Sequence, residues 1–231
     1  MTISVIIPVL HEQQRINALI GHLKGLGAGG RGQEKTDLEI IVVDGDLAGS
    51  TVKTITDSSV ITLWAARGRG AQLAEGFSIA NGDIILMLHA DTCLPDNALQ
   101  SIASACAAGV DWGAFRLGID ARGLGYRIIE RAVDLRCTLF SLPYGDQALF
   151  VTRNALLQVE GIPTIPLMED VALVLRLRRS GKRFKLLHDR VQTSARRWKK
   201  DGIFRRTLKN WVILLRYLSG ANPVDLASQY R

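Results

Sequence analysis

The sequence predicts an α/β fold in which a mostly parallel sheet is flanked by helices. Two observations lead to this fold class. Short apolar runs rich in β-branched residues recur through residues 1–91, and amphipathic stretches of helical period separate them. Strands that alternate with helices at this spacing build a parallel sheet covered by helices on both faces.

The first predicted strand is residues 3–9, an apolar run that ends at a proline and a valine. Residues 12–26 follow as a helix, because their apolar side chains recur every three or four positions. A loop over residues 27–37 leads to a second strand at 38–46, which stops at acids and glycine. A further helix is expected to begin near Ser50.

Residues 60–64 are the third predicted strand, and residues 70–80 form a helix closed by Asn-Gly. Residues 83–91 (DIILMLHAD) are the fourth strand, again ending in an acid. Beyond this point the pattern is less regular. The remaining expected elements are helices at 95–107, 124–139, 170–180 and 203–218, strands at 114–119 and 147–152, and a tail at 223–231.

Composition indicates a folded protein of one domain with an appendage. Of 231 residues, 47% are hydrophobic and 22% are charged, which excludes a disordered chain. The three cysteines show no Cys-x-x-Cys spacing, so we expect neither a disulfide framework nor a zinc knuckle, and a cytoplasmic location is expected. The N-terminus lacks the basic start of a signal peptide, and no apolar run reaches the roughly 20 residues of a spanning helix.

Charge is distributed unevenly along the chain. Residues 171–231 carry 16 Lys and Arg against 3 acids, whereas residues 1–170 carry 13 against 19. The basic end predicts an anionic partner, which could be phosphate groups, an acidic membrane or nucleic acid. A solvated basic face without a partner is the alternative.

Functional residue types gather where the predicted strands end. The segments 8–12, 44–46 and 89–91 each contain acids, and residues 66–70 contain two arginines. Ligands of open parallel sheets bind beyond the carboxyl ends of the strands. Carboxylates suit Mg²⁺ or Mn²⁺, and arginines suit phosphate, so these segments predict a pocket for a metal-chelated phosphate ligand.

The same segments carry a family resemblance. SVIIPVLHE, VVDGDLAGST and ANGDIILMLHADTCLP resemble family-2 glycosyltransferases with the GT-A fold. ARGRGAQL, LHADT, YGDQALFV, MEDVALVLRLRRSGK and TSARRW resemble one bacterial subgroup, the radical-SAM/selenodomain-associated "transferase 2" proteins. The resemblance implies a GT-A domain over residues 1–195, with a nucleotide-binding half at about 1–95 and an acceptor half at about 96–195. Residues 196–231 would be a basic helical extension.

The function implied by this resemblance is inverting transfer of a hexose from a nucleotide-diphospho-sugar, with a UDP-sugar as first choice, to a hydroxyl acceptor. The implied cofactor is a divalent cation, Mn²⁺ or Mg²⁺, bound by Asp91, and His89 replaces the first aspartate of the usual motif. Asp44 would contact the base or ribose, and Arg67 the base or phosphate. The implied nucleotide-sugar site comprises Pro8, Leu10, Glu12, Asp44, Arg67, Gly70, Ala90 and Asp91.

Glu169 and Asp170 match the acid pair of the family. Asp170 would be the base that takes the proton of the acceptor hydroxyl. A plain helix cap is the alternative, because acids at a helix start complement the dipole. The acceptor and diphosphate side would comprise Gly145, Asp146, Gln147, Arg196, Arg197 and Trp198.

Two other functions compete with glycosyl transfer. A sugar-phosphate nucleotidyltransferase shares the sheet, but it needs a glycine-rich loop where this chain has PVLHE. A non-catalytic module that binds anionic membrane or nucleic acid would use the basic end, with Phe184 and Trp198 between the cations. No signature of a nucleic-acid fold is present. Peripheral attachment to an anionic membrane, near an acceptor that can be lipid-linked, is therefore the preferred use of the surplus charge.

Overall fold

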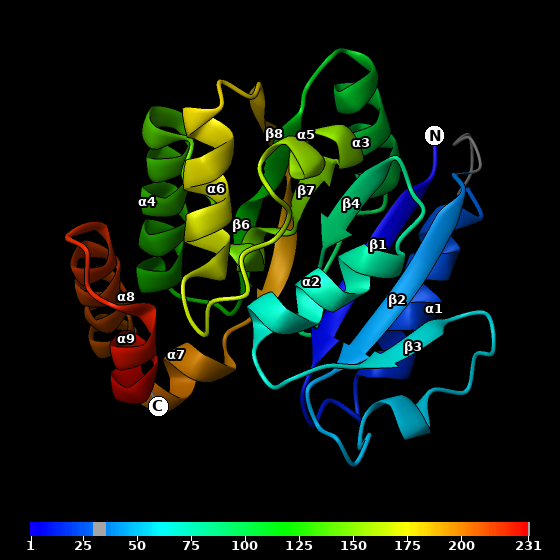
Figure 1. Ribbon diagram of the computed structural model, residues 1–231. Coiled ribbons are helices and arrows are strands. Elements are labelled where there is room, and N and C mark those ends of the chain that lie inside the picture. Colours follow the sequence, from blue (N-terminus) through cyan, green and yellow to red (C-terminus); the bar gives the residue numbers. More distant parts are fainter. Residues whose placement is uncertain (30–35, 231) are drawn as a thin grey trace.

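The computed structural model describes residues 1–29 and 36–230, and within them the chain forms one eight-stranded sheet. The strand order is β3-β2-β1-β4-β7-β6-β8-β5 (Figure 1). The strands are β1 (Ile3–Val9), β2 (Leu38–Asp44), β3 (Ile61–Trp64), β4 (Ile84–Met87), β5 (Thr92–Cys93), β6 (Trp112–Asp120), β7 (Leu149–Thr152) and β8 (Phe184–Ser194).

The sheet is mostly parallel, as predicted. β1 pairs in parallel with β2 and β4, β2 with β3, and β6 with β8. β7 is antiparallel to both of its neighbours, β4 and β6, and β5 is antiparallel to β8. The parallel half is the part of the chain in which strands and helices alternate regularly.

Helices cover both faces of the sheet because the strands alternate their side chains between two apolar cores. Ile3, Val5 and Ile7 face one core, which is shared with α1 (Ile16–Gly27) and α3 (Ala98–Ala107). Ile6, Ile41 and Ile85 face the other core, which is shared with α2 (Arg69–Ile79), α5 (Arg153–Gln158) and α6 (Glu169–Arg179). The arrangement is the expected helix–sheet–helix sandwich.

The C-terminal segments pack against the rest of the described chain. α7 (Arg196–Asp201), α8 (Ile203–Leu218) and α9 (Pro223–Tyr230) lie beside α4 (Leu124–Phe140) and α6 (Figure 1). Leu226 of α9 is fully buried against Ile213 of α8 and Leu167. Among the described residues, no helix combines the length and apolar character needed to cross a membrane.

Several local predictions were wrong or incomplete. The helix expected near Ser50 is only a 3-10 turn, η1 (Val52–Thr54), because the buried Asp44 carboxylate accepts the amides of Thr51 and Val52. The expected tail contains the helix α9, and its last residue, 231, lies outside the described part. β8 and α5 were not predicted at all. β8 carries Lys185 and His188 on exposed positions and the half-buried Arg190, and these polar side chains obscure its apolar alternation.

Candidate active site

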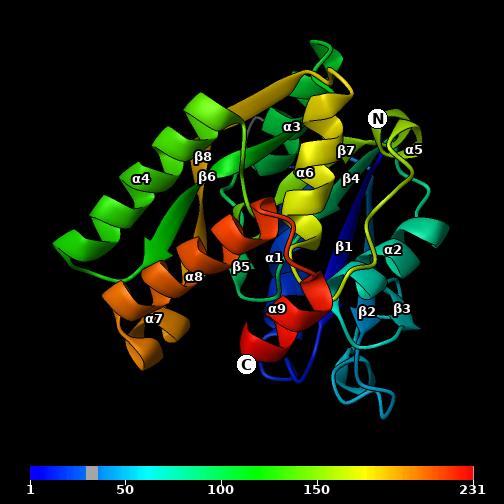
Figure 2. The same cartoon turned by 60° about the vertical axis from the view of Figure 1, so that its left-hand side comes forward.

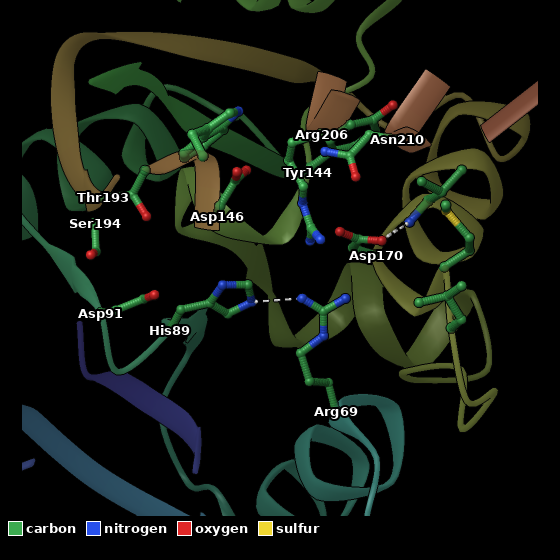
Figure 3. Close-up of a pocket in the computed structure, with 14 residues that line it drawn as sticks. Arg69, His89, Asp91, Tyr144, Asp146, Asp170, Thr193, Ser194, Arg206 and Asn210 are labelled. Atoms are coloured by element: carbon green, nitrogen blue, oxygen red, sulfur yellow. Dashed lines mark hydrogen bonds between the residues drawn. The ribbon is translucent and has the colours of Figure 1, made fainter. Parts of the chain in front are cut away.

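A cleft of about 840 Å³, open solvent at its mouth included, lies beyond the end of β4 (Figure 3). Its walls come from segments distant in sequence. The lining residues are Arg69, His89, Asp91, Tyr144, Asp146, Leu167, Met168, Asp170, Val171, Thr193, Ser194, Trp198, Arg206 and Asn210. Three carboxylates and two arginines therefore meet in one space, which matches the predicted chemistry for a phosphate-bearing ligand.

An ion pair joins two helix starts at the edge of this cleft. Arg69 Nε lies 2.7 Å from Oε1 of Glu169, whose side chain is 3% exposed. Glu169 Oε2 is buried and has no hydrogen-bond partner among the described residues. Burial raises the pKa of Glu169 from 4.5 to about 7, against the opposing effect of Arg69. Glu169 thus holds Arg69 and α2 in place and does not itself line the cleft.

Asp170 follows Glu169 and does line the cleft. Its Oδ2 accepts the amide hydrogen of Gly145 at 2.8 Å, and its Oδ1 accepts that of Val171 at 2.8 Å. A Cβ on Gly145 would lie 3.0 Å from His89 Nε2 and 3.3 Å from Asp170 Oδ2. Gly145 therefore leaves the room that these two side chains occupy. Each Asp170 oxygen takes only one of these bonds, so both retain capacity to accept a substrate proton.

The preceding residue, Met168, has φ 65°, the left-handed region that non-glycine residues rarely adopt. This residue is the N-cap of α6. The chain turns sharply there, and the first turn of α6 then begins with Glu169 and Asp170. Backbone strain of this kind is stored where the surrounding structure fixes a functional geometry.

Asp146 is the third acid of the cleft. Burial raises its pKa, and the nearby Asp170 and Asp91 raise it further, while Arg136 and Arg69 oppose the shift. Arg136 lies over the ring of Tyr144, 3.6 Å from its centroid. Burial raises the pKa of Tyr144 to about 12, so its hydroxyl stays protonated and can donate a hydrogen bond.

Asp91, which was predicted to bind a divalent cation, has a carboxylate that faces the cleft. Its carboxylate makes no hydrogen bond or ion pair with the described residues, and it lines the cleft beside His89, Thr193 and Ser194 (Figure 3). In the described ranges no cluster of three or more metal-ligating side chains occurs. A single carboxylate fits a Mg²⁺-type ion when phosphate oxygens of a ligand supply the other positions. His89 faces Arg69 instead, with Nε2 3.5 Å from Nη1.

The predicted nucleotide residues of β1 and β2 lie outside this cleft. Asp44 is fully buried, and its carboxylate accepts the amides of Asp46, Thr51 and Val52, so it organises the loop after β2. Pro8 is buried within β1, and Leu10 is half-buried just beyond it. Glu12 reaches across the sequence to Arg196, with Oε1 3.6 Å from Nη2.

Other predicted residues lie as follows. Arg67 is exposed in the loop before α2, while its neighbour Arg69 enters the cleft. Gly70 is buried, and a Cβ there would lie 2.4 Å from the carbonyl oxygen of Pro163, so it permits close packing of α2. Ala90 is half-buried against the core.

Gln147 does not reach the cleft. Its side chain is fully buried, donating to the carbonyl of Phe115 and accepting from the amide of Tyr144. It therefore fixes the turn η2 (Gly145–Gln147). Trp198 does line the cleft, whereas the side chain of Arg197 lies outside the described part of the structure.

Several cleft residues were not predicted. Arg69 belongs to the ARGRGAQL segment, in which the prediction named Arg67; the nucleotide contact of Arg67 stays a prediction. Tyr144 precedes the predicted Gly145, which was a usable signal. Thr193 and Ser194 begin the TSARRW segment, so a motif covered them, but their place in the cleft was not predicted. No sequence signal pointed to Arg206 or Asn210, because α8 reaches the cleft only through the tertiary fold.

Comparison with known proteins identifies the family. Residues 4–153 match the profile described as Glycosyl transferase family 2, which covers more than half of the chain. The chain belongs to glycosyl transferase family 2. A dolichol-phosphate mannosyltransferase of Mycosarcoma maydis is 27% identical over 109 residues, which are 44% of this chain and 37% of that protein. The family prediction is confirmed, and the narrower bacterial subgroup stays a prediction.

Solved structures support the fold. The mannosyltransferase PcManGT of Pyrobaculum calidifontis, in complex with GDP-Man and Mn²⁺, aligns with a TM-score of 0.62 and 17% identity, over 82% of this chain and 56% of that one. TarS residues 1–349 of S. aureus, in complex with UDP-GlcNAc, align with a TM-score of 0.60 and 17% identity, over 84% of this chain and 58% of that one. Glucosyl-3-phosphoglycerate synthase of Mycobacterium tuberculosis, in complex with Mn²⁺, UDP and glucosyl-3-phosphoglycerate, aligns with a TM-score of 0.58 and 18% identity. The alignment covers 84% of this chain and 70% of that one.

These alignments confirm the GT-A fold. The chain spans little more than a third of the length of the mannosyltransferase of Mycosarcoma maydis and less than two thirds of PcManGT and TarS.

Proposed function

We propose that this chain transfers a hexose from a nucleotide-diphospho-sugar to a hydroxyl acceptor with inversion at the anomeric carbon. The observation that carries the proposal is the meeting of Asp91 and Asp170 in one cleft, in a chain of glycosyl transferase family 2. Asp91 is free to face a cation-bound diphosphate, and Asp170 is free to face an acceptor. One cleft thus contains a group for each half of the reaction.

In the proposed reaction the acceptor oxygen attacks the anomeric carbon as Asp170 takes its proton. The bond from the anomeric carbon to the diphosphate oxygen breaks, and the nucleoside diphosphate leaves with that electron pair. Arg69 and Arg206 line the cleft and favour the charge that builds up on the leaving group. Arg196, held near Glu12, would act on the same side.

The proposal also covers the donor and the cation. Mn²⁺ or Mg²⁺ held by Asp91 would neutralise charge on the departing diphosphate. The related structures contain UDP-GlcNAc, GDP-Man or UDP, and two of them contain Mn²⁺, which supports a nucleotide-sugar donor here. A UDP-sugar remains the first choice. We also propose a cytoplasmic location with peripheral attachment of the basic end to an anionic membrane, and no role for nucleic acid.

A thermal-shift panel tests the function without knowledge of the acceptor. UDP, GDP, ADP and CDP are each added to the full chain with and without Mn²⁺. A ligand present at a hundredfold its dissociation constant stabilises the folded state by about 2.7 kcal/mol. We expect a shift with one diphosphate that is larger with Mn²⁺. The absence of a shift with every nucleotide at millimolar concentration would contradict the proposal.

A further inference from the structure

A second pocket opens beside the cleft and shares a wall with it. It measures about 730 Å³, open solvent included, and lies between α4, β6 and α8. Tyr144, Asp146, Trp198 and Asn210 line both spaces. A molecule in the second pocket can therefore extend a polar end to the catalytic cleft without crossing a protein layer.

The second pocket has an apolar body and a polar end. Its apolar lining comprises Leu117, Ile128, Ile129, Ala132, Val133 and Trp211. Arg136, Tyr144 and Asp146 form the polar end. Such a combination is typical of a site that binds an apolar group and orients one polar group of the same ligand.

Two polar atoms on the wall are left unsatisfied. Trp198 Nε1 and Thr207 Oγ1 are both buried, and neither has a hydrogen-bond partner within the described residues. Both residues line this pocket. Buried polar groups are satisfied in the great majority of cases, so these two atoms point to a ligand from outside the chain that brings polar atoms at one end of its apolar body.

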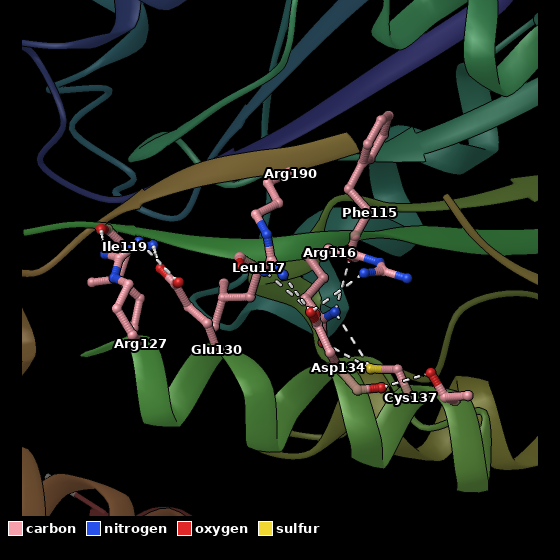
Figure 4. Close-up of polar contacts among 11 residues, drawn as sticks. Phe115, Arg116, Leu117, Ile119, Arg127, Glu130, Asp134, Cys137 and Arg190 are labelled. Atoms are coloured by element: carbon pink, nitrogen blue, oxygen red, sulfur yellow. Dashed lines mark hydrogen bonds and ion pairs between the residues drawn. The ribbon is translucent and has the colours of Figure 1, made fainter. Parts of the chain in front are cut away.

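The wall formed by α4 is held firmly from its inner face (Figure 4). The buried Glu130 accepts the amide hydrogen of Ile119 at 2.7 Å and pairs with Arg127 at 2.9 Å. One turn further along, Asp134 pairs with Arg190 of β8. Because carboxylates fasten α4 to the sheet, its apolar side chains at the opposite face stay turned outward.

That outer face of α4 is an exposed apolar stripe. It consists of Leu124, Ile128, Leu135 and Leu139, which are 82%, 65%, 59% and 63% exposed and recur at helical spacing. α8 presents a second stripe, made of Leu208, Trp211, Val212, Leu215 and Leu218. The two helices lie side by side (Figure 2). Ile128 and Trp211 belong to both a stripe and the pocket lining, so apolar surface continues from the pocket out along both helices.

Charge indicates what covers these stripes. The helices that carry the stripes also carry cations. α4 contains Arg127 and Arg131, and α8 contains Arg205, Lys209 and Arg216. Apolar faces bordered by cations suit an anionic lipid surface. A second copy of this chain would instead bring cations against cations. The apolar surface also extends well beyond the pocket, further than a small acceptor would cover.

We propose that the pocket between α4 and α8 binds the hydrocarbon tail of a lipid acceptor, which an anionic membrane presents to the two apolar stripes. The hydroxyl of that acceptor passes Asp146 and enters the catalytic cleft, where Asp170 is the proposed base. The proposal rests on the proposed function for the identity of the ligand as an acceptor. The pocket itself is a binding site whose chemistry can be measured without any transfer reaction.

The test compares 1-octanol with 1-butanol by calorimetric titration into the full chain. Both probes carry a hydroxyl, and they differ by four methylenes. Each buried methylene is worth about fourfold in affinity, so octanol gains up to about 200-fold if the tail enters the pocket. Ala132→Trp fills the pocket from an exposed position of α4. Leu139→Trp is the matched control, because it adds a tryptophan to the same helix outside the lining.

We expect octanol to bind the native chain and Leu139→Trp at least tenfold more tightly than butanol, and Ala132→Trp to lose this difference. Equal affinity for the two alcohols, or an unchanged octanol affinity in a folded Ala132→Trp, would overturn the proposal. A stable dimer in light scattering that Leu215→Glu dissociates would also overturn it, because a second copy would then cover the stripes.

A nucleotide titration distinguishes failure of this proposal from failure of the proposed function. UDP, GDP, ADP and CDP, each with Mn²⁺, are titrated into the same three proteins. Nucleotide binding with no preference for octanol overturns the tail site alone. A preference for octanol without nucleotide binding contradicts the proposed function and leaves the pocket as a tail site whose ligand is not an acceptor.

Discussion

Arg69 Nε lies 2.7 Å from Oε1 of Glu169 and thereby joins the first turn of α2 to the first turn of α6. The same guanidinium lies 3.5 Å from His89 and lines the cleft. A buried carboxylate thus holds an arginine where an anionic ligand would lie. The acid pair therefore divides its work between positioning by Glu169 and the catalytic role proposed for Asp170.

The first prediction concerns the pH dependence of stability. The pKa of Glu169 is raised from 4.5 to about 7, so between these values the folded state binds more protons than the unfolded state. The free energy of unfolding should fall as the pH rises through this window, by on the order of 1–3 kcal/mol. Glu169→Gln removes this titration. Urea unfolding at pH 5, 6, 7 and 8 measures the difference between the two proteins, and a difference that is constant or rises with pH contradicts the prediction.

The second prediction concerns the base. Asp170→Asn should reduce transfer by roughly 100- to 10,000-fold and leave nucleotide affinity within a few fold. As a plain helix cap, Asp170→Asn would be nearly neutral, because asparagine caps about as well as aspartate. Rates of sugar release from the donor, with the melting temperature as a folding control, separate the two roles. Asp146→Asn is the matched variant, and native activity in Asp170→Asn would make Asp146 the next candidate.

The third prediction concerns space at Gly145. Gly145→Ala should push His89 and the Asp170 carboxylate aside, because its Cβ would lie 3.0 Å and 3.3 Å from their nearest atoms. A displacement of this kind should lower turnover by up to about 100-fold. Gly21→Ala in α1 is the control. Its Cβ would meet no atom within 4 Å, so we expect native turnover and a gain in stability of roughly 0.5–1 kcal/mol. Equal turnover in both variants would show that the geometry at Gly145 does not matter.

The fourth prediction concerns the basic end. Lys200 is exposed on α7, and Lys200→Glu should weaken co-sedimentation with anionic vesicles, since each cation near the surface contributes about 1 kcal/mol. Lys53 is exposed on η1, and Lys53→Glu makes the same charge change in the N-terminal half. We expect binding that falls with salt and is lost more in Lys200→Glu. Equal binding to neutral and anionic vesicles would exclude an electrostatic attachment, and tight duplex binding would favour nucleic acid.

The parallel half of the fold could be predicted because each strand is a buried apolar run bounded by helix signals. β8 could not, since it pairs on one side with only the two-residue β5 and carries charged side chains where it is exposed. The spacing of apolar residues along the sequence indicates which side chains are buried. A strand that is buried on one face and carries charged side chains on the other does not show this spacing clearly. α9 was missed for a related reason, because its burial rests mainly on Leu226.

The candidate site likewise contains features that the sequence could predict and features that it could not. Asp91, Asp146 and Asp170 were predicted and do meet in one cleft, because each lies in a short motif in a loop, in a turn or at the start of a helix. Asp44 was assigned to the nucleotide by its motif; the structure shows that its carboxylate accepts three backbone amides of the following loop, and a nucleotide contact stays a prediction. Sequence indicates which residue types are present near a strand end, but only the fold determines whether a carboxylate faces a ligand or its own loop.

The most direct test of the account is calorimetric titration of UDP, with and without Mn²⁺, into the native chain and Asp91→Ala. The account predicts that Mn²⁺ tightens UDP binding to the native chain at least tenfold, and that Asp91→Ala loses this gain while its melting temperature stays native. His89→Asp should strengthen the effect of Mn²⁺, since it adds a carboxylate beside Asp91. A folded Asp91→Ala that binds UDP with the same dependence on Mn²⁺ as the native chain would contradict the account.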